Sequence, residues 1–160
     1  MLDVMIVARM PEPDPQPQFL PVQRLRADAE LPARTHPWDA GLDLVAVEAV
    51  HLEPRGRAVV PTGIAVAIPP GWAGLVVPRS GLARRQGITL TNSPGLIDAG
   101  YRGEIQILVI NHGAEPQTIV AGERVAQLVL VPVSMARIVE VQELPDSDGR
   151  GSGGFGSSGR

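Results

Sequence analysis

The stretch IAVAIPPGWAGLVVP, residues 64–78, shows most directly how this chain folds. It holds two short runs rich in Val and Ile, residues 64–68 and 72–78, and a Pro-Pro-Gly turn separates them. Runs of this length and composition, bounded by Pro and Gly, are typical of β-strands joined by tight connections. The stretch therefore predicts two successive strands.

The same pattern continues in both directions along the chain. Apolar runs alternate with Pro, Gly, Asn or Asp about every 8 to 12 residues, which favours an antiparallel sandwich or a closed barrel. One short helix is predicted over residues 80–86, with Ser80 as its N-cap. The other predicted strands span residues 19–26, 42–49, 57–61, 88–90, 105–111, 117–120, 124–133 and 138–140.

The composition supports one β-rich domain and excludes several classes of protein. Hydrophobic residues make up 44% of the 160 residues and aromatic residues only 3%, so the core must be aliphatic. The 18 Gly and 16 Pro rule out long helices and a coiled coil. A net charge of −3 argues against a nucleic acid as the main partner. No apolar run approaches the ~20 residues that cross a bilayer, so no membrane partner is expected.

Two residue types are absent, and each absence excludes a kind of chemistry. All 14 basic residues are Arg, which excludes a Walker A loop, a Schiff base and a lysine general base. The chain has no Cys, so disulfides, thiol nucleophiles and iron–sulfur clusters are also excluded. A chain without Cys fits a cytoplasmic protein.

The two ends of the chain differ from the part between them. The first 18 residues end in a Pro-rich stretch that is typical of an extended linker. Gly and Ser dominate the C-terminal end, where Phe155 is the last apolar residue, and this composition predicts a flexible segment. We therefore expect an N-terminal extension over 1–18, a β-barrel domain over 19–144 and a flexible Gly-rich arm over 145–160.

Five short stretches could carry chemistry, and three of them each place a polar residue in an apolar setting. AGLDL holds Asp43 at the start of a strand, where a turn-capping role is the alternative. PRSGLA sets Arg79 before a helical turn, where the N–H groups of Ser80 and Gly81 suit an anion; an ordinary capped turn is the alternative. GERVAQL places Gln127 in a strand, where it needs either a ligand or a structural partner.

The other two stretches combine Gly with an aromatic residue. NSPGLIDAGYRGEI predicts a β-hairpin, with Asp98 beside Tyr101. A carboxylate and an aromatic ring among three Gly suit a ring-bearing ligand, although turn residues alone would explain the pattern. RGSGGFGSSG combines Arg150 with Phe155, an aromatic face for a base, in a run whose N–H groups could form an anion-binding nest.

In this order, the five stretches resemble the five motifs of the trimeric dUTP diphosphatase (dUTPase) family. The resemblance covers roughly residues 19–159 and leaves the first 18 unexplained. It implies a jelly-roll-like β-barrel that forms a homotrimer with active sites at the subunit interfaces. The implied reaction is hydrolysis of dUTP to dUMP and pyrophosphate, by attack of water on the α-phosphorus with Mg²⁺ as cofactor. This reaction limits uracil incorporation into DNA and supplies dUMP for thymidylate synthesis.

The resemblance also implies a role for each matching residue. Asp98 matches the catalytic base, and Gln127 matches a residue that orients phosphate or water. Asp43 matches the residue that holds the waters around Mg²⁺, without touching the ion itself. The implied substrate-binding residues are Arg79, Ser80, Gly81, Asn92, Leu96, Ile97, Asp98, Tyr101, Gln106, Arg150, Phe155, Gly156 and Ser157.

These residues divide among the parts of the nucleotide. Asn92 and the backbone of residues 96–98 would read the edge of uracil, and Tyr101 would lie under the deoxyribose, where it excludes a 2′-hydroxyl. Gln106 would contact the ligand from the return strand. Phe155 would close over uracil in a neighbouring subunit, with Arg150 on the phosphates.

Two other functions stay open at this stage. A dCTP deaminase of the same superfamily uses a glutamate near the base, and Glu104 is the candidate here. A non-catalytic dUTP-binding or protein-interaction module is the second alternative. The NSPGLID stretch and the Gly-rich arm with its Phe are diphosphatase features, and all five stretches keep their chemical residues.

Overall fold

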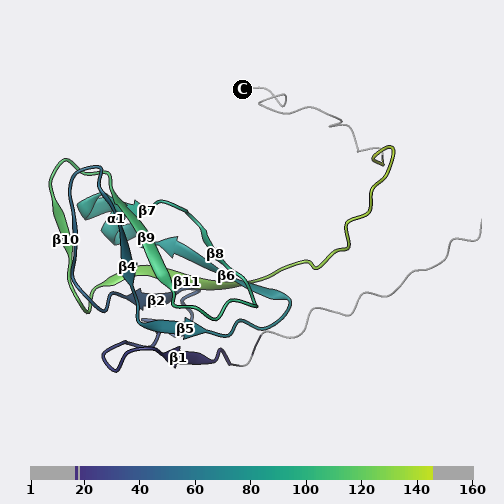
Figure 1. Ribbon diagram of the computed structural model, residues 1–160, viewed down its shortest axis with the longest axis horizontal. Coiled ribbons are helices and arrows are strands. Elements are labelled where there is room, and N and C mark those ends of the chain that lie inside the picture. The colour runs from purple at the N-terminus through teal and green to yellow at the C-terminus, as the bar shows by residue number, and fades with distance from the viewer. Residues whose placement is uncertain (1–16, 18, 146–160) are drawn as a thin grey trace, which may run out of the picture.

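Eleven strands and one short helix make up the described part of the computed structural model, which covers residues 17 and 19–145 (Figure 1). The predicted all-β fold with a single helix is confirmed, and the arrangement is consistent with a jelly roll. The elements are β1 (Val22–Arg24), β2 (Leu42–Val45), β3 (Val50–Leu52), β4 (Arg57–Pro61), β5 (Ile64–Val66), β6 (Trp72–Pro78), α1 (Ser80–Gln86), β7 (Ile88–Leu90), β8 (Gly95–Ile97), β9 (Gln106–Asn111), β10 (Gln117–Ile119) and β11 (Arg124–Pro132).

The described strands form four antiparallel sheets. The largest has the order β2-β11-β6-β8, and a three-stranded sheet has the order β4-β9-β7. Two-stranded pairs, β1-β5 and β3-β10, complete the arrangement. No two neighbouring strands in these described sheets are consecutive in the chain, so the connections cross between sheets, and the sheets bury one shared core.

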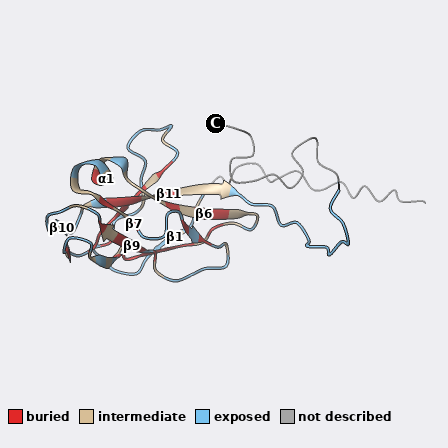
Figure 2. Cartoon of the chain, turned by 90° about the horizontal axis from the view of Figure 1, so that it is seen from above, coloured by how far each residue is buried: buried red, intermediate tan, exposed pale blue. Residues whose placement is uncertain are grey.

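The core is aliphatic, as the composition predicts. All three residues of β5 and three of the four in β2 are buried, and Figure 2 shows further buried segments in β6 and β11. Strand β9 alternates exposed and buried positions, which is the pattern of a strand with one face on the core. At Gly74 in β6, a Cβ atom would lie 2.7 Å from Ile68 Cδ1 and 2.9 Å from Leu128 Cδ1, so a side chain here would have to displace both core residues.

Helix α1 has the predicted bounds but not the predicted cap. Arg79 occupies the N-cap position, in an extended conformation and without a side-chain capping bond, and Ser80 is the first helical residue. At the other end, Gly87 takes a left-handed φ of 69°, and a Cβ there would lie 2.7 Å from the Gly113 nitrogen. Glycine therefore ends the helix, because both its conformation and its surroundings exclude a side chain.

Several predicted strands need correction. The expected strand over 42–49 ends at residue 45, the expected strand over 19–26 covers only residues 22–24, and the sequence analysis missed β3. The expected hairpin over 92–103 is wrong, because β8 pairs with β6 while β9 pairs with β4 and β7. The expected strand over 138–140 is also wrong: Ile138 is 97% exposed, and no strand partner lies beside it in the described protomer.

The segment after β11, residues 133–145, runs away from the barrel in both views (Figures 1 and 2). It carries several exposed apolar side chains, among them Met135, Ile138 and Leu144. A β-rich sequence forms a strand only where a second strand supplies hydrogen-bond partners, which explains why the Val and Ile content misled the prediction here. Among the described residues, no helix has the length and apolar character to cross a membrane.

Candidate active site

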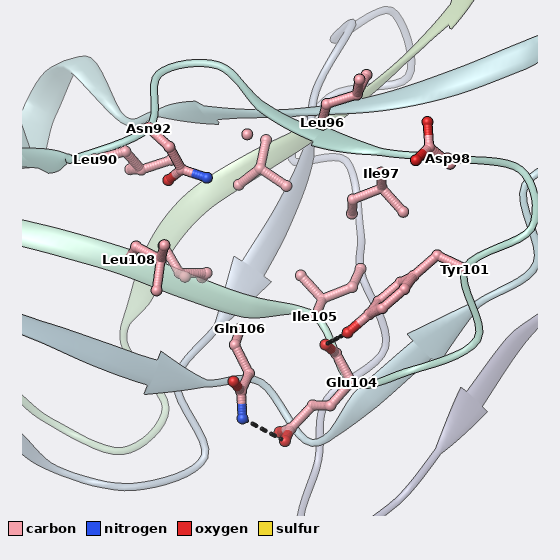
Figure 3. A pocket seen from close by; sticks show the side chains of 13 residues that line it. Leu90, Asn92, Leu96, Ile97, Asp98, Tyr101, Glu104, Ile105, Gln106 and Leu108 are labelled. Atoms are coloured by element: carbon pink, nitrogen blue, oxygen red, sulfur yellow. Dashed lines mark hydrogen bonds between the residues drawn. The ribbon is translucent and has the colours of Figure 1, made fainter.

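A cleft of about 300 Å³ lies between β8, at the edge of the four-stranded sheet, and β9 in the three-stranded sheet. Figure 3 shows β8 residues above the cleft and β9 residues below it. Buried aliphatic side chains, including Ile97, Ile105 and Ile107, line the cleft. The predicted residues Asn92, Leu96, Ile97, Asp98, Tyr101 and Gln106 all line this one cleft.

The backbone of β8 gives the cleft a polar edge. Within the described sheet, β8 pairs only with β6, so its other edge is not paired with a strand. In an antiparallel pair, alternate residues direct their N–H and C=O groups away from the partner. Backbone donors and acceptors of β8 therefore lie beside the cleft, and this arrangement suits a planar ligand with hydrogen-bonding edges.

Tyr101 forms one side of the cleft, and its neighbours hold it there. Its hydroxyl donates a 2.9 Å hydrogen bond to the Glu104 carbonyl oxygen (Figure 3). A Cβ at Gly103 would lie 2.5 Å from the Tyr101 hydroxyl oxygen, so the ring needs glycine at this position. The Tyr-Arg-Gly-Glu order thus folds the aromatic ring back against its own loop.

The Glu104 carboxylate forms hydrogen bonds along the lower wall of the cleft. Its Oε1 accepts a 2.7 Å bond from the Gly63 N–H, and its Oε2 accepts a 3.3 Å bond from the Gln106 amide. Gln106 therefore has one end of its amide engaged and the carbonyl end available. Figure 3 shows the Gln106 and Glu104 side chains on the same side of the cleft.

Asp98 and Asn92 lie toward opposite ends of the cleft (Figure 3). Asp98 is exposed, and its main-chain carbonyl accepts the Tyr101 N–H in a turn. In the described part of the chain, no donor is hydrogen-bonded to its carboxylate oxygens. An exposed carboxylate without donors is free to accept a proton from water.

Three other predicted residues, Asp43, Arg79 and Gln127, lie together with Arg124 and Thr35, which were not predicted. We call these five residues the Asp43 cluster. The Asp43 carboxylate is buried on β2 and forms ion pairs of 3.0 Å with both arginines. Gln127 and Thr35 each lie 3.3 Å from it. Ser80 and Gly81 follow Arg79 in α1 but have no side-chain bond to the cluster.

The sequence analysis missed Arg124, and the reason lies in β11. Residues three apart in a regular strand face opposite sides, so Arg124 and Gln127 should point apart. The register shifts between Arg124 and Ala126, and this β-bulge places one extra residue in β11. Arg124 and Gln127 consequently both reach Asp43. The sequence does show Arg124 as a second polar residue in GERVAQL, but only the bulge in β11 brings its side chain to Asp43.

Strand register separates the cleft from the cluster. Gln127 pairs with Val77 on one side of β6, and Ile97, the neighbour of Asp98, pairs with Gly74 on the other side. Four positions along β6 and two strand spacings across it put the backbones of Gln127 and Asp98 about 16 Å apart. The Gln127 amide also points to β2, away from β8. Within one protomer, the two side chains do not converge.

The carboxylates in the described range do not form a metal-binding cage. No group of three or more His, Asp or Glu side chains with the geometry for a metal ion occurs in the residues that the structure describes. The predicted residues Arg150, Phe155, Gly156 and Ser157 lie outside that range, as do almost all of the predicted extension and arm.

Comparison with known proteins agrees with this geometry. The dUTPase family model matches residues 27–159. The chain belongs to the dUTPase family. It is 55% identical over 130 residues to a deoxyuridine 5′-triphosphate nucleotidohydrolase of Leifsonia xyli, which covers 81% of this chain and 85% of the relative. It is 52% identical over 145 residues to the corresponding enzyme of Gloeobacter violaceus, with 89% and 98% covered.

Solved dUTPase structures share the fold. A variant of the Staphylococcus bacteriophage 80alpha dUTPase with dUpNHpp has a TM-score of 0.85 at 33% identity, covering 90% of this chain and 100% of the other. A variant of the phage phi11 dUTPase, whose structure concerns the coordination of a structural Mg(II) ion, has a TM-score of 0.76 at 31% identity, with 80% and 99% covered.

Proposed function

We propose that this member of the dUTPase family hydrolyses dUTP to dUMP and pyrophosphate. The observation that carries the proposal is the cleft itself, where an unpaired strand edge, a held aromatic ring and a carboxylate without donors line one space. Membership of the family and about half-identical relatives named as nucleotidohydrolases support it.

The edge of β8 would read the base. Uracil presents an N3 donor between two carbonyl acceptors, and the Asn92 amide and the backbone of residues 96–98 offer complementary groups. Cytosine places an amino donor where uracil has the O4 acceptor, so donors would face donors, and unpaired buried groups reject such a ligand strongly. A backbone in contact with C5 of the base would leave no room for the thymine methyl group.

Tyr101 would select the sugar. Its ring is fixed by the bond to Glu104 and by the absence of a side chain at Gly103. A ring that lies against the deoxyribose occupies the space of a ribose 2′-hydroxyl. Gln106, held through its nitrogen by Glu104, would offer its carbonyl oxygen to a hydroxyl donor of the sugar.

Asp98 would act as the general base. Its carboxylate would take a proton from a water molecule, and the resulting nucleophile would attack the α-phosphorus with pyrophosphate as the leaving group. Arg79, with the N–H groups of Ser80 and Gly81, would bind the phosphates, and Gln127 would orient phosphate or water. In the predicted arm, Phe155 would close over the base and Arg150 would bind the phosphates. Gly156 and Ser157 would be further substrate-binding residues.

One complete site needs more than one copy of the chain. Because Asp98 and Gln127 lie about 16 Å apart across β6, they would act on one phosphorus only if neighbouring subunits supply one each. The exposed apolar side chains of residues 133–145 supply a surface for such contacts. Both observations support the homotrimer with interfacial sites.

The predicted cofactor, Mg²⁺, enters this proposal as an ion that the triphosphate itself carries. Mg²⁺ keeps much of its water shell and is often bound through substrate phosphates. Asp43, the residue predicted to hold those waters, does not fit that role in the described structure, because its oxygens are already engaged by protein donors.

The contacts of Glu104 count against the deaminase alternative. A deaminase glutamate must exchange protons with water and base, but both oxygens of Glu104 accept bonds that hold the wall of the cleft. The non-catalytic alternative has no observation in its favour, since Asp98 and Gln127 are both present.

Product analysis with dUTP, dTTP, dCTP and UTP tests the proposal. We expect pyrophosphate release from dUTP, with the other three nucleotides at least a hundredfold slower, on the order of the discrimination that unpaired buried groups supply. Release of ammonia from dCTP would instead support the deaminase. Binding of dUTP without any product would support a non-catalytic module.

A further inference from the structure

The Asp43 carboxylate is the most heavily engaged side chain of the cluster. Its Oδ1 accepts bonds from Arg79 Nε at 3.0 Å and from the Gln127 amide at 3.3 Å. Its Oδ2 accepts bonds from Arg124 Nη1 at 3.0 Å and from the Thr35 hydroxyl at 3.3 Å. An ionised carboxylate has about four lone-pair directions, so protein donors occupy all of them.

The burial of the three charged groups shows which of them is fixed. The side chain of Asp43 is 8% exposed, that of Arg79 is 24% exposed and that of Arg124 is 48% exposed. A buried carboxylate needs compensating charge and full hydrogen bonding, and two guanidinium groups supply both. The pairing leaves a net charge of one positive unit, which attracts phosphates and repels a cation.

The backbone around Asp43 fixes the geometry of the cluster. Asp43 lies opposite Gln127 in the β2–β11 ladder, and the bulge in β11 turns Arg124 to the same side. A Cβ at Gly41 would lie 3.0 Å from the Gln127 side chain, so the chain leaves space for that amide to reach the carboxylate. Arg79 is held a second time, because its Nη1 donates to the Arg124 carbonyl oxygen at 3.2 Å.

We propose that Asp43 is a positioning residue, which holds Arg79, Arg124 and Gln127 in the orientation that receives the triphosphate, and that it is not an acceptor for water around a metal ion. The proposal also assigns Arg124 to the phosphate-binding group, as the more exposed of the two cations. It rests on the proposed function, since it concerns how this chain binds the phosphates of dUTP.

The two roles predict different effects of magnesium on ligand binding. Calorimetry would measure the affinity of wild type and Asp43→Asn for the α,β-imido analogue of dUTP, once with Mg²⁺ and once with EDTA. Positioning predicts that Asp43→Asn weakens binding on the order of 10- to 100-fold, by the same factor in both buffers. Glu48→Gln, an exposed loss of the same charge near β2, is the matched control and should bind like wild type.

A loss of affinity confined to the magnesium buffer would overturn the proposal, because it would mean that Asp43 acts through the ion. Binding equal to wild type in both buffers would overturn it as well. In an Arg79→Gln background, Asp43→Asn should lower the affinity for the analogue by a smaller factor than in wild type, because one of the side chains that Asp43 positions is already gone. An unchanged factor in that background would show that Asp43 does not act through Arg79.

Arg124→Gln keeps the test decisive if Asp43→Asn does not fold. This variant removes the more exposed cation of the cluster and leaves Asp43 Oδ2 with one hydrogen bond fewer. Positioning predicts weaker analogue binding by equal factors in the two buffers. If Asp43 held water around Mg²⁺, the freed oxygen would instead increase the factor by which Mg²⁺ raises the affinity for the analogue. Wild-type turnover of dUTP is measured alongside, so that failure of the proposed function is seen separately.

Discussion

The cleft around Asp98 and the Asp43 cluster use the same side chain in opposite ways. Asp98 is exposed and its carboxylate accepts no bond from the described residues, whereas Asp43 is buried and accepts bonds from four side chains. The Asp98 carboxylate can therefore exchange a proton with water, whereas the Asp43 carboxylate only holds its hydrogen-bond donors in place. Reactivity and positioning thus occupy separate regions, on opposite sides of β6.

Asp98→Asn is expected to have the largest effect on turnover. The amide is nearly isosteric with the carboxylate but cannot accept the proton of the attacking water. We expect kcat for dUTP to fall about 10²- to 10⁴-fold, while binding of the imido analogue stays within a few-fold of wild type. Retention of more than about a tenth of wild-type kcat would show that Asp98 is not the base.

Truncation after Gly149 sharpens the comparison, because it removes the predicted arm and leaves both regions in place. The buried core lies between Ala29 and Leu128, so the melting temperature should stay nearly unchanged. We expect turnover to fall on the order of 10²-fold, since donors around the developing phosphate charge would be lost. Phe155→Ala in the full chain should cost less, because only stacking on the base is lost. Turnover near the wild-type level in the truncated chain would mean that the arm does not contribute to catalysis.

Tyr101→Ala should relax the selection of sugar more than the selection of base. The ring excludes the 2′-hydroxyl by its volume, while the base is read by β8. The rate for UTP relative to dUTP should rise on the order of tenfold, with dCTP still rejected. Tyr101→Phe is the control, since it loses the bond to Glu104 but keeps the ring. A ratio that does not change in Tyr101→Ala would mean that the ring does not select the sugar.

Ile138→Ser should have the smallest effect on chemistry and a clear effect on assembly. Ile138 is almost wholly exposed in the protomer, and its burial in a subunit contact would contribute about 1.5–3 kcal/mol. Sedimentation at falling protein concentration should show earlier dissociation than in wild type. Ala136→Ser, in the same segment, should sediment like wild type. Equal sedimentation of all three proteins would place the subunit contact elsewhere.

Elements bounded by strong turn chemistry could be predicted from the sequence alone. The bounds of β4, β6, β7 and α1 agree with the expected ranges, because Pro or Gly stands at or next to their ends. The residues of the cleft were also predictable, since one continuous stretch supplies most of them and the resemblance names their roles.

Pairing between strands was the part that the sequence did not reveal. NSPGLIDAGYRGEI has the turn residues of a hairpin, yet its first half forms β8 of one sheet and its second half leads into β9 of another, and the cleft lies between these two strands. The bulge that turns Arg124 toward Asp43 has no local signal either, because it depends on the register with β2. Long-range register decides both features, and local propensity carries no information about it.

The most direct test of the central claim is to mix two inactive proteins, Asp98→Asn and Gln127→Ala, and let their subunits exchange. If neighbouring subunits supply Asp98 and Gln127 to one site, a random mixture of trimers should recover about a quarter of wild-type activity, because that share of sites receives both native residues. Mass spectrometry of differently tagged subunits would establish the exchange. No recovery after complete exchange would mean that each site draws both residues from one chain, and the separation of the two regions would then have no role in catalysis.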